Sequence, residues 1–251
     1  MTRRFCHAGC HVMNEIAECC KVLKLSRNIV ENSKTLSAET HPEFLLKLLK
    51  LELEHRVDVR YNRLIKKAGF QNLKSFNQLD FKEIKLPQSI TSEELKKCDF
   101  IVQKQNIIMY GNVGTGKTHL ATAIGIEACK AGKKVGFYRT AALVNQLIEV
   151  KKEGRLSLFM KKISGLDLLI CDEWGYVPMD REGCQLLFQI ISDCYERRSL
   201  IITTNLEFSK WINVFYDEQM TAAMIDRMIH HSHLLIFDGQ SYRMKHSNIR
   251  S

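Results

Sequence analysis

The sequence predicts an α/β fold, with a parallel five-stranded sheet flanked by helices and a small helical domain before it. From about residue 93 onward, short apolar runs of strand character alternate with longer segments of helical pattern. Such alternation requires crossover connections, which produce a parallel sheet buried on both faces. Residues 13–67 carry helical patterns alone, and they predict the separate helical domain.

The composition is that of a soluble globular protein with a basic excess. Of the 251 residues, 45% are hydrophobic and 26% are charged, and the formal net charge is +9. No apolar run approaches the roughly 20 residues of a membrane span, so we expect a cytoplasmic protein without a membrane partner. Nine scattered cysteines, an odd number, fit reduced thiols better than disulfides. The positive charge favours a nucleic-acid partner, since Lys and Arg neutralise phosphates.

The helical domain is predicted over residues 1–68, with 1–12 as a possible extension. An apolar band runs along its long second half, at Phe44, Leu45, Leu48, Leu49, Leu51 and Leu53. Residues 69–92 contain Gly, Pro, Asn and Ser without a clear period, and we expect a linker there. Residues 93–251 form the second predicted domain.

Five strands and four helices are expected in the second domain. The strands are residues 106–110, 135–138, 166–171, 200–204 and 234–237. The helices cover residues 119–131, 141–150, 183–195 and 218–231. Phosphates bind such sheets at the carboxyl ends of the strands, on the N-terminus of the helix after the first strand. Only 14 residues follow Phe237, so we expect no full C-terminal helical lid.

Residues 111–118 form a phosphate-binding loop, Gly-Asn-Val-Gly-Thr-Gly-Lys-Thr, between a predicted strand and a predicted helix. Its glycines let backbone N–H groups turn inward around a phosphate. Lys117 would reach the β- and γ-phosphates, and the Thr118 hydroxyl would be a ligand of Mg²⁺. The sequence therefore predicts a nucleoside triphosphate site made by Gly111, Asn112, Val113, Gly114, Thr115, Gly116, Lys117, Thr118 and His119.

Two adjacent carboxylates, Asp172 and Glu173, end a strongly apolar strand. Acidic residues are rarely placed at a buried strand end unless they have a partner. Asp172 would hold Mg²⁺ opposite Thr118, and Glu173 would polarise the attacking water. This pair favours hydrolysis over nucleotide binding alone, although an acidic loop after a strand is the plain alternative.

Two further residues are candidates for the same chemistry. Asn205 follows the strand at 200–204 and can orient the attacking water or sense the γ-phosphate; a turn-forming Asn is the alternative. Arg227 lies among apolar neighbours on a predicted helix and can complete a neighbouring subunit's site. A surface arginine paired with Asp226 is the alternative there.

Five motifs in this order resemble a known family. They are the loop from Gly111 with His-Leu-Ala after it, Leu-Leu-Ile-Cys-Asp-Glu-Trp-Gly-Tyr-Val-Pro-Met-Asp from Leu168, Ile-Ile-Thr-Thr-Asn-Leu-Glu-Phe-Ser-Lys-Trp from Ile201, Asp-Arg-Met-Ile-His-His-Ser-His from Asp226 and Ser-Tyr-Arg-Met-Lys from Ser241. They resemble the IstB-like ATPases, the helper ATPases of insertion sequences. These are close relatives of DnaC-type helicase loaders in the AAA+ superfamily. The resemblance covers about residues 14–246.

The resemblance implies an ATP- and Mg²⁺-dependent homo-oligomer, with ATP at subunit interfaces, that assembles on double-stranded DNA. It also implies that the protein helps a transposase to choose and engage a target. By the same likeness Asn205 corresponds to the first sensor and Arg227 to the arginine that acts in the neighbouring subunit. Arg243 is a candidate for a second nucleotide sensor.

A basic segment between the second and third predicted strands would face DNA in such an assembly. Its cations are Lys151, Lys152, Arg155, Lys161 and Lys162. They would contact phosphates and carry no base information, and a solvated helix face explains the same pattern equally well. No recognition-helix pattern indicates sequence-specific binding.

Other functions share parts of this pattern. A DnaC-like helicase loader has every motif above and differs mainly in its partner. A non-hydrolysing, ATP-switched DNA scaffold would retain the phosphate loop, but Glu173 argues against it. A small-molecule kinase is a more distant alternative, because no acceptor-binding element is evident.

Overall fold

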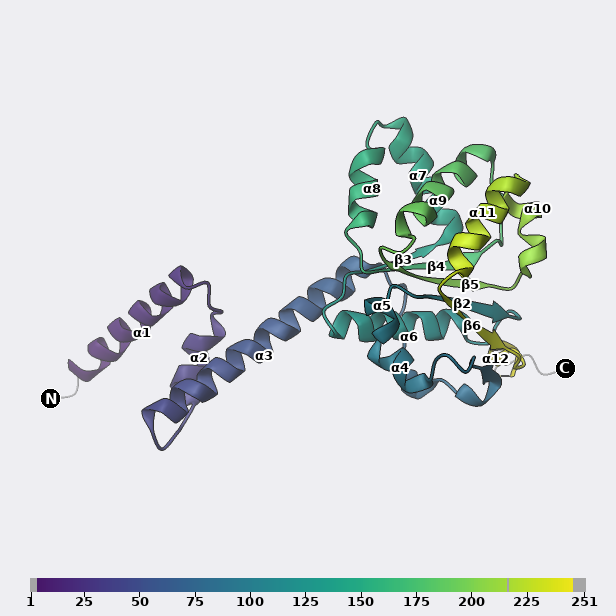
Figure 1. Ribbon diagram of the computed structural model, residues 1–251. Coiled ribbons are helices and arrows are strands. Elements are labelled where there is room, and N and C mark those ends of the chain that lie inside the picture. The colour runs from purple at the N-terminus through teal and green to yellow at the C-terminus, as the bar shows by residue number, and fades with distance from the viewer. Residues whose placement is uncertain (1–3, 216, 246–251) are drawn as a thin grey trace. The chain divides into compact units, whose positions relative to one another are not determined.

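The computed structural model describes residues 4–215 and 217–245, and the chain divides into two compact units, residues 1–63 and 64–251. The outermost residues of both predicted domains therefore lie outside the described part. Among the described residues, no helix is long and apolar enough to cross a membrane. The two units are described separately below (Figure 1).

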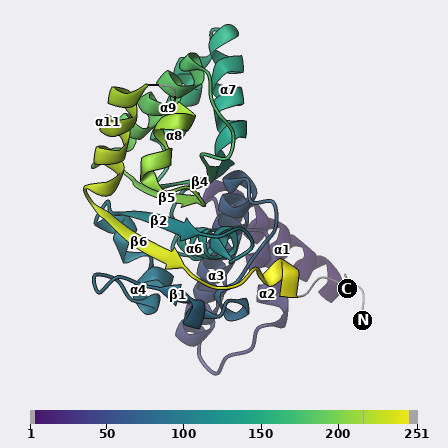
Figure 2. The same ribbon diagram turned by 90° about the vertical axis from the view of Figure 1, so that its right-hand side faces the viewer.

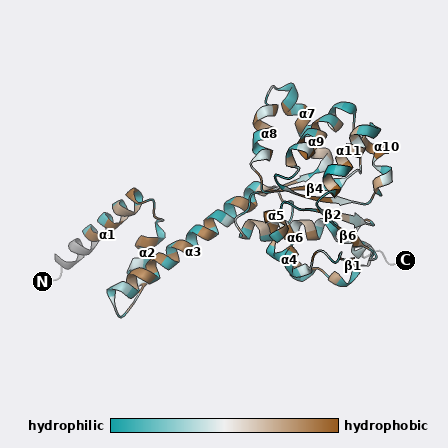
Figure 3. Cartoon of the chain, viewed as in Figure 1, coloured by the Kyte–Doolittle hydropathy of each residue, from teal (hydrophilic) through white to brown (hydrophobic). Residues whose placement is uncertain are grey.

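The first unit consists of three helices with a small apolar core. Helix α1 spans Arg4–Val22, α2 spans Asn28–Thr35, and α3 spans His41–Ala68, so that its last turn belongs to the second unit. Cys20, Ile29, Val30 and Leu48 form the buried core. Hydrophobic and hydrophilic residues alternate along α3 (Figure 3). Of the apolar band in its sequence, Leu48 is buried, whereas Leu45, Leu49 and Leu53 are exposed.

The second unit is built on one sheet with the strand order β1-β6-β2-β5-β4-β3. Its strands are β1 (Ile84–Lys85), β2 (Asn106–Gly111), β3 (Val135–Arg139), β4 (Leu168–Trp174), β5 (Ser199–Thr204) and β6 (Ser232–Phe237). Strands β2 to β6 are parallel, which confirms the predicted five-stranded parallel sheet. Strand β4 runs three residues further than expected, through both carboxylates to Trp174.

A sixth strand, β1, pairs antiparallel with β6 at the edge of the sheet. It lies within residues 69–92, which also contain the short 3₁₀ helices η1 (Phe76–Gln78) and η2 (Phe81–Glu83). The side chains of Phe76, Ile84 and Ile90 are buried. A two-residue strand is too short to show an alternation of apolar and polar residues, so it could not be predicted from the sequence.

Helices cover both faces of the sheet (Figures 1 and 2). One layer contains α4 (Ser92–Lys97), α5 (Asp99–Val102) and α6 (Lys117–Lys130). The other contains α7 (Thr140–Lys152), α8 (Leu156–Ser164), α9 (Arg181–Cys194), α10 (Ile212–Phe215), which follows the 3₁₀ helix η3 (Phe208–Lys210), and α11 (Glu218–Ile229). The short helix α12 (Tyr242–Lys245) follows β6. This double covering explains why the central strands are almost uniformly apolar.

Candidate nucleotide site at the carboxyl edge of the sheet

The phosphate loop connects the end of β2 to the start of α6. Gly114 and Gly116 have φ values of +82° and +100°, which L residues with a side chain rarely adopt. A Cβ atom on Gly111 would lie 2.2 Å from the backbone oxygen of Phe237 on β6. The neighbouring strand therefore leaves no room for a side chain at this position, and the glycine spacing of the motif follows from the packing.

Lys117 is buried, with 6% of its surface exposed. Its ammonium donates hydrogen bonds to the backbone oxygens of Gly111 (2.7 Å) and Asn112 (2.6 Å). Burial lowers the pKa of Lys117 to about 8; the charge of Asp172 opposes this shift, and that of Arg243 adds to it. A buried ammonium with a lowered pKa gains from an anion beside it, as a nucleotide phosphate would be.

Asp172 is held by hydroxyl groups from three different elements and is 2% exposed. The Thr118 hydroxyl donates to its carboxylate at 2.9 Å, and the Thr203 hydroxyl donates at 2.6 Å. The Thr140 hydroxyl donates to its backbone oxygen at 2.8 Å. The structure thus brings together Thr118 and Asp172, the two residues that the sequence assigned to Mg²⁺.

Glu173 has an unusual backbone conformation for a strand residue, with φ of +58°. The ladder between β4 and β5 is irregular between Cys171 and Trp174. At this bulge the Glu173 carboxylate lies 3.5 Å from the Arg139 guanidinium at the end of β3. Left-handed backbone at a non-glycine residue is uncommon and concentrates at functional sites.

Asn205 comes directly after β5, whose last residue, Thr204, pairs with Trp174 of β4. Its side-chain oxygen is buried and, within the described part of the chain, has no hydrogen-bond partner. A water or a ligand group would satisfy such an orphaned acceptor.

The two arginine candidates are placed differently. Arg243 follows β6, and its charge acts on Lys117 and on Tyr176, so it belongs to the surroundings of the phosphate loop. Arg227 on α11 instead lies over the Phe188 ring of α9, with 4.9 Å from its guanidinium carbon to the ring centroid. Its guanidinium also donates a hydrogen bond to the backbone oxygen of Ala223 at 3.4 Å.

The segment after β6 lies against the phosphate loop. The backbone N–H of Tyr242 donates to the Gly114 oxygen at 3.0 Å, and a Cβ atom on Gly114 would lie 2.2 Å from the Ser241 hydroxyl. After the loop, His119 Nε2 lies 2.9 Å from the backbone oxygen of Ser75.

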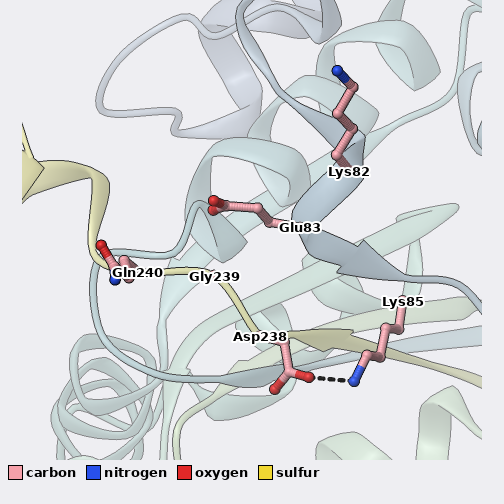
Figure 4. A pocket seen from close by; sticks show the side chains of 6 residues that line it. All are labelled: Lys82, Glu83, Lys85, Asp238, Gly239 and Gln240. Carbon is pink, nitrogen blue, oxygen red and sulfur yellow. Dashed lines mark hydrogen bonds and ion pairs between the residues drawn. The ribbon is translucent and has the colours of Figure 1, made fainter.

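A shallow pocket of about 390 Å³ lies at the sheet edge rather than at the phosphate loop. Its lining residues, drawn in Figure 4, come from η2, β1 and the segment after β6: Lys82, Glu83, Lys85, Asp238, Gly239 and Gln240. Two of them, Lys85 and Asp238, form an ion pair (Figure 4). None of the pocket's lining residues is among the candidates for nucleotide binding or hydrolysis.

The predicted DNA-contacting cations lie at the end of α7 and along α8, and all five are exposed. Three have intramolecular contacts: Lys151 pairs with Glu182, Arg155 pairs with Glu153, and Lys162 lies over the rings of Tyr138 and Phe159. Among the described residues, Lys152 and Lys161 make no ion pair or side-chain hydrogen bond. These two are therefore the most available for a phosphate.

The residues present fit a magnesium nucleotide. A threonine hydroxyl and a carboxylate are the oxygen ligands that Mg²⁺ prefers, and Thr118 and Asp172 supply both within hydrogen-bond distance of each other. Lys117 lies at the N-terminus of α6, where backbone N–H groups and the helix dipole favour a phosphate.

A model of the family of IstB-like ATP-binding proteins matches residues 21–249. The chain belongs to this family.

Individual relatives match the IstB-like chain over most of their length, and their names describe ATP-binding proteins of insertion sequences. One, of IS232 from Bacillus thuringiensis subsp. berliner, is 37% identical over 206 residues, 81% of either chain. Another, of IS21 from Pseudomonas aeruginosa, is 36% identical over 203 residues, 81% of this chain and 77% of the relative. A third, of an IS21-like element from Bacteroides fragilis, is 30% identical and covers 92% of this chain and 90% of the relative.

Solved structures share the fold of this IstB-like protein at lower sequence identity. DnaI, at 18% identity, gives a TM-score of 0.53 and matches 68% of this chain and 90% of its own. The replication initiator DnaA bound to AMPPCP and single-stranded DNA, at 24% identity, gives 0.50 and matches 61% of this chain and 47% of its own. These likenesses agree with the AAA+ core that the resemblance implied.

The sequence did not predict a role for Thr203 or for Arg139. Thr203 contacts Asp172, and Arg139 contacts Glu173. Thr203 lies within the motif that begins at Ile201, two residues before Asn205, whereas Arg139 lies in none of the five motifs. One signal was available for Thr203: it is a polar residue near the end of an apolar strand that neighbours the acidic one. Arg139 gave none, because a cation after a short strand is an ordinary solvent-exposed residue.

Proposed function

We propose that this IstB-like protein is a Mg²⁺-dependent ATPase of the cytoplasm that assembles on duplex DNA and assists the transposase of its insertion sequence. Membership of the family supports ATP binding, and the names of the relatives support the insertion-sequence context. The basic net charge of +9 is consistent with a DNA partner.

The proposed hydrolysis rests on the Asp172–Glu173 pair. Thr118 and Asp172 would hold Mg²⁺, and Lys117 would bind the phosphates. When bound, Mg²⁺ would neutralise charge that develops on the phosphate oxygens. Glu173, which is 42% exposed, would take the proton of the attacking water. Asn205, whose side-chain oxygen has no hydrogen-bond partner among the described residues, would orient that water.

The proposed assembly uses Arg227. Its side chain packs on α9 rather than beside Lys117, so it would serve a neighbouring copy. In that arrangement the guanidinium would stabilise charge on the γ-phosphate of the neighbour's nucleotide. Hydrolysis would then depend on the assembled state, and DNA would promote hydrolysis by promoting assembly.

The observation that carries the proposal is the placement of Asp172 against Thr118 with Glu173 on a bulge beside them. The decisive measurement is steady-state ATP hydrolysis with and without duplex DNA. We expect turnover by the wild type with DNA, none by Lys117→Ala, and a fall of at least about 100-fold for Glu173→Gln with ATP binding retained. If the wild type shows no turnover, or if Glu173→Gln matches it, the chain is a switched scaffold instead.

Two further measurements test the partners. Arg227→Ala should lower DNA-stimulated turnover without weakening ATP binding by the isolated chain, and mixing it with Lys117→Ala should restore partial activity at shared interfaces. For the transposase, DNA strand transfer into a duplex target should depend on this protein and fail with Lys117→Ala. Stimulation of a replicative helicase rather than the transposase would identify a loader.

A further inference from the structure

A single buried hydroxyl connects both carboxylate residues of the site. Thr203 on β5 is 2% exposed. Its hydroxyl donates to Asp172 Oδ1 at 2.6 Å and accepts the backbone N–H of Glu173 at 3.0 Å. We propose that Thr203 is a positioning residue for ATP hydrolysis, which orients Asp172 and Glu173 together. The inference rests on the proposed ATPase function.

The register of the sheet explains why a side chain is needed here. Strands β4 and β5 pair regularly up to Cys171 and Ile202, and they pair again at Trp174 and Thr204. Between these pairs, two residues of β4 lie opposite the single residue Thr203. Such a bulge takes a backbone N–H out of the ladder, and the Thr203 hydroxyl provides the partner that the N–H of Glu173 loses.

The bulge also changes where Glu173 points. In a regular strand, successive side chains alternate between the two faces of the sheet. Without the bulge, the Glu173 side chain would therefore point to the face opposite that of Asp172, into the core. That core already contains both Cys171 and Trp174. With the extra residue and a φ of +58°, Glu173 instead meets Arg139 at the sheet edge. The hydrogen bond from the Glu173 N–H to the Thr203 hydroxyl stabilises this backbone conformation.

A hydroxyl is suited to both tasks at once. It has one hydrogen to donate and lone pairs to accept, so Thr203 can hold the carboxylate and the N–H simultaneously. The Thr118 hydroxyl also donates to Asp172, but Thr118 would turn to Mg²⁺ when the metal binds. Thr203 would then be the side chain that keeps the Asp172 carboxylate oriented.

The test compares Thr203→Val, which keeps the shape and removes the hydroxyl, with Thr203→Ser, which keeps the hydroxyl. Ser199→Ala is the control, because Ser199 lies at the opposite end of β5, is also buried and donates its hydroxyl hydrogen to the backbone oxygen of Phe100. Two experiments are carried out on the full chain. One measures kcat and KM for ATP with duplex DNA, and the other measures the Mg²⁺ concentration that half-saturates binding of a fluorescent ATP analogue.

Thr203→Val should lower kcat at least about tenfold and raise the half-saturating Mg²⁺ concentration severalfold, with KM within about threefold of wild type. Thr203→Ser and Ser199→Ala should stay within about threefold of the wild type in kcat, KM and the half-saturating Mg²⁺ concentration. The inference is wrong if Thr203→Val keeps wild-type kcat and Mg²⁺ dependence, or if Thr203→Ser or Ser199→Ala loses as much as Thr203→Val.

Two outcomes need separate treatment. If circular dichroism shows that Thr203→Val is unfolded, Thr203→Ala takes its place in the comparison with Thr203→Ser. If the wild type hydrolyses no ATP, the proposed function fails, and the role of Thr203 in hydrolysis fails with it, but the orientation of Asp172 by Thr203 can still be tested. The Mg²⁺ dependence of nucleotide binding then decides alone: an unchanged value in Thr203→Val overturns the inference, and a raised value supports the orientation of Asp172 by Thr203.

Discussion

The guanidinium of Arg139 lies 3.5 Å from the carboxylate of Glu173, which joins the ends of β3 and β4. Arg139 also donates a hydrogen bond to the Gln71 side chain at 3.0 Å. The carboxylate proposed to activate water is therefore already engaged by a cation of its own chain. Both side chains are about half exposed, so this ion pair contributes at most about 1 kcal/mol to stability.

Releasing Glu173 from this ion pair should raise basal activity. We expect Arg139→Gln to increase ATP hydrolysis without DNA about two- to fivefold, the factor that corresponds to an ion pair of up to about 1 kcal/mol. The melting temperature should change by only a few degrees. Arg139→Lys, which keeps the charge, is the control and should resemble the wild type. A fall in basal turnover in Arg139→Gln would mean that Arg139 assists Glu173 instead.

The left-handed backbone at Glu173 predicts an unusual order of stability among variants that lack the carboxylate. At a φ of +58°, glycine avoids a strain of about 1 kcal/mol that alanine retains. Glu173→Gly should therefore be more stable to urea unfolding than Glu173→Ala by roughly that amount. In a strand of ordinary backbone conformation the order is the reverse, because glycine destabilises the folded protein relative to alanine. Both variants should be inactive. Equal or reversed stabilities would show that the backbone at residue 173 is not strained.

The lowered pKa of Lys117, about 8, predicts that nucleotide affinity depends on pH. A bound phosphate stabilises the charged ammonium and raises its pKa, so binding above pH 8 must take up a proton. Affinity for MgATP should be constant below about pH 8 and then fall by up to about tenfold per pH unit. Titration calorimetry in two buffers of different ionisation enthalpy measures the proton uptake.

Lys117→Arg is the control for this pH dependence, because a guanidinium stays protonated throughout the range. Its residual affinity should not vary between pH 7.5 and 9.5. A wild-type affinity that is equal at both pH values would contradict a titration of Lys117 in this range.

The contacts of the basic segment predict which cations bind DNA. Lys152 and Lys161 are exposed and make no ion pair among the described residues, whereas Lys162 packs over two aromatic rings. The double variant Lys152→Gln/Lys161→Gln should lower the salt dependence of duplex binding by about two counterions, one per lost phosphate contact. Lys162→Gln is the comparison and should change it less. Fluorescence anisotropy at several salt concentrations distinguishes the two, and equal slopes would exclude this segment as the DNA contact.

The sequence predicted the parts of the fold that have a period. Alternation of apolar strands and helices identified the five parallel strands, because a sheet covered on both faces requires long apolar runs. It missed β1, whose position depends on the edge of β6 rather than on its own two residues. It also ended the third predicted strand, which corresponds to β4, at residue 171, because two carboxylates after an apolar run resemble the start of a loop.

The residues of the candidate site also divide into those that a local sequence pattern predicts and those that it does not. The phosphate loop has a motif, and the position of Asp172 follows from the topology of a parallel sheet. Thr203 and Arg139 have roles only through the register of neighbouring strands. The contact of Ser241 with Gly114 depends on how the chain turns after β6. Such relationships come from packing between distant segments, and no local pattern encodes them.

The bulge has a consequence for how this protein could change. Because Asp172 and Glu173 together oppose Thr203 alone, a strand without residue 173 would be a regular one. Cys171 and Trp174 would still share a face, as they do in the core now, and Asp172 would still adjoin Thr118. Nucleotide binding by Thr118 and Asp172 therefore does not require the bulge. The proposed ATP hydrolysis does require it, because it depends on the additional residue Glu173. A three-base deletion could remove this residue and leave a folded nucleotide-binding protein.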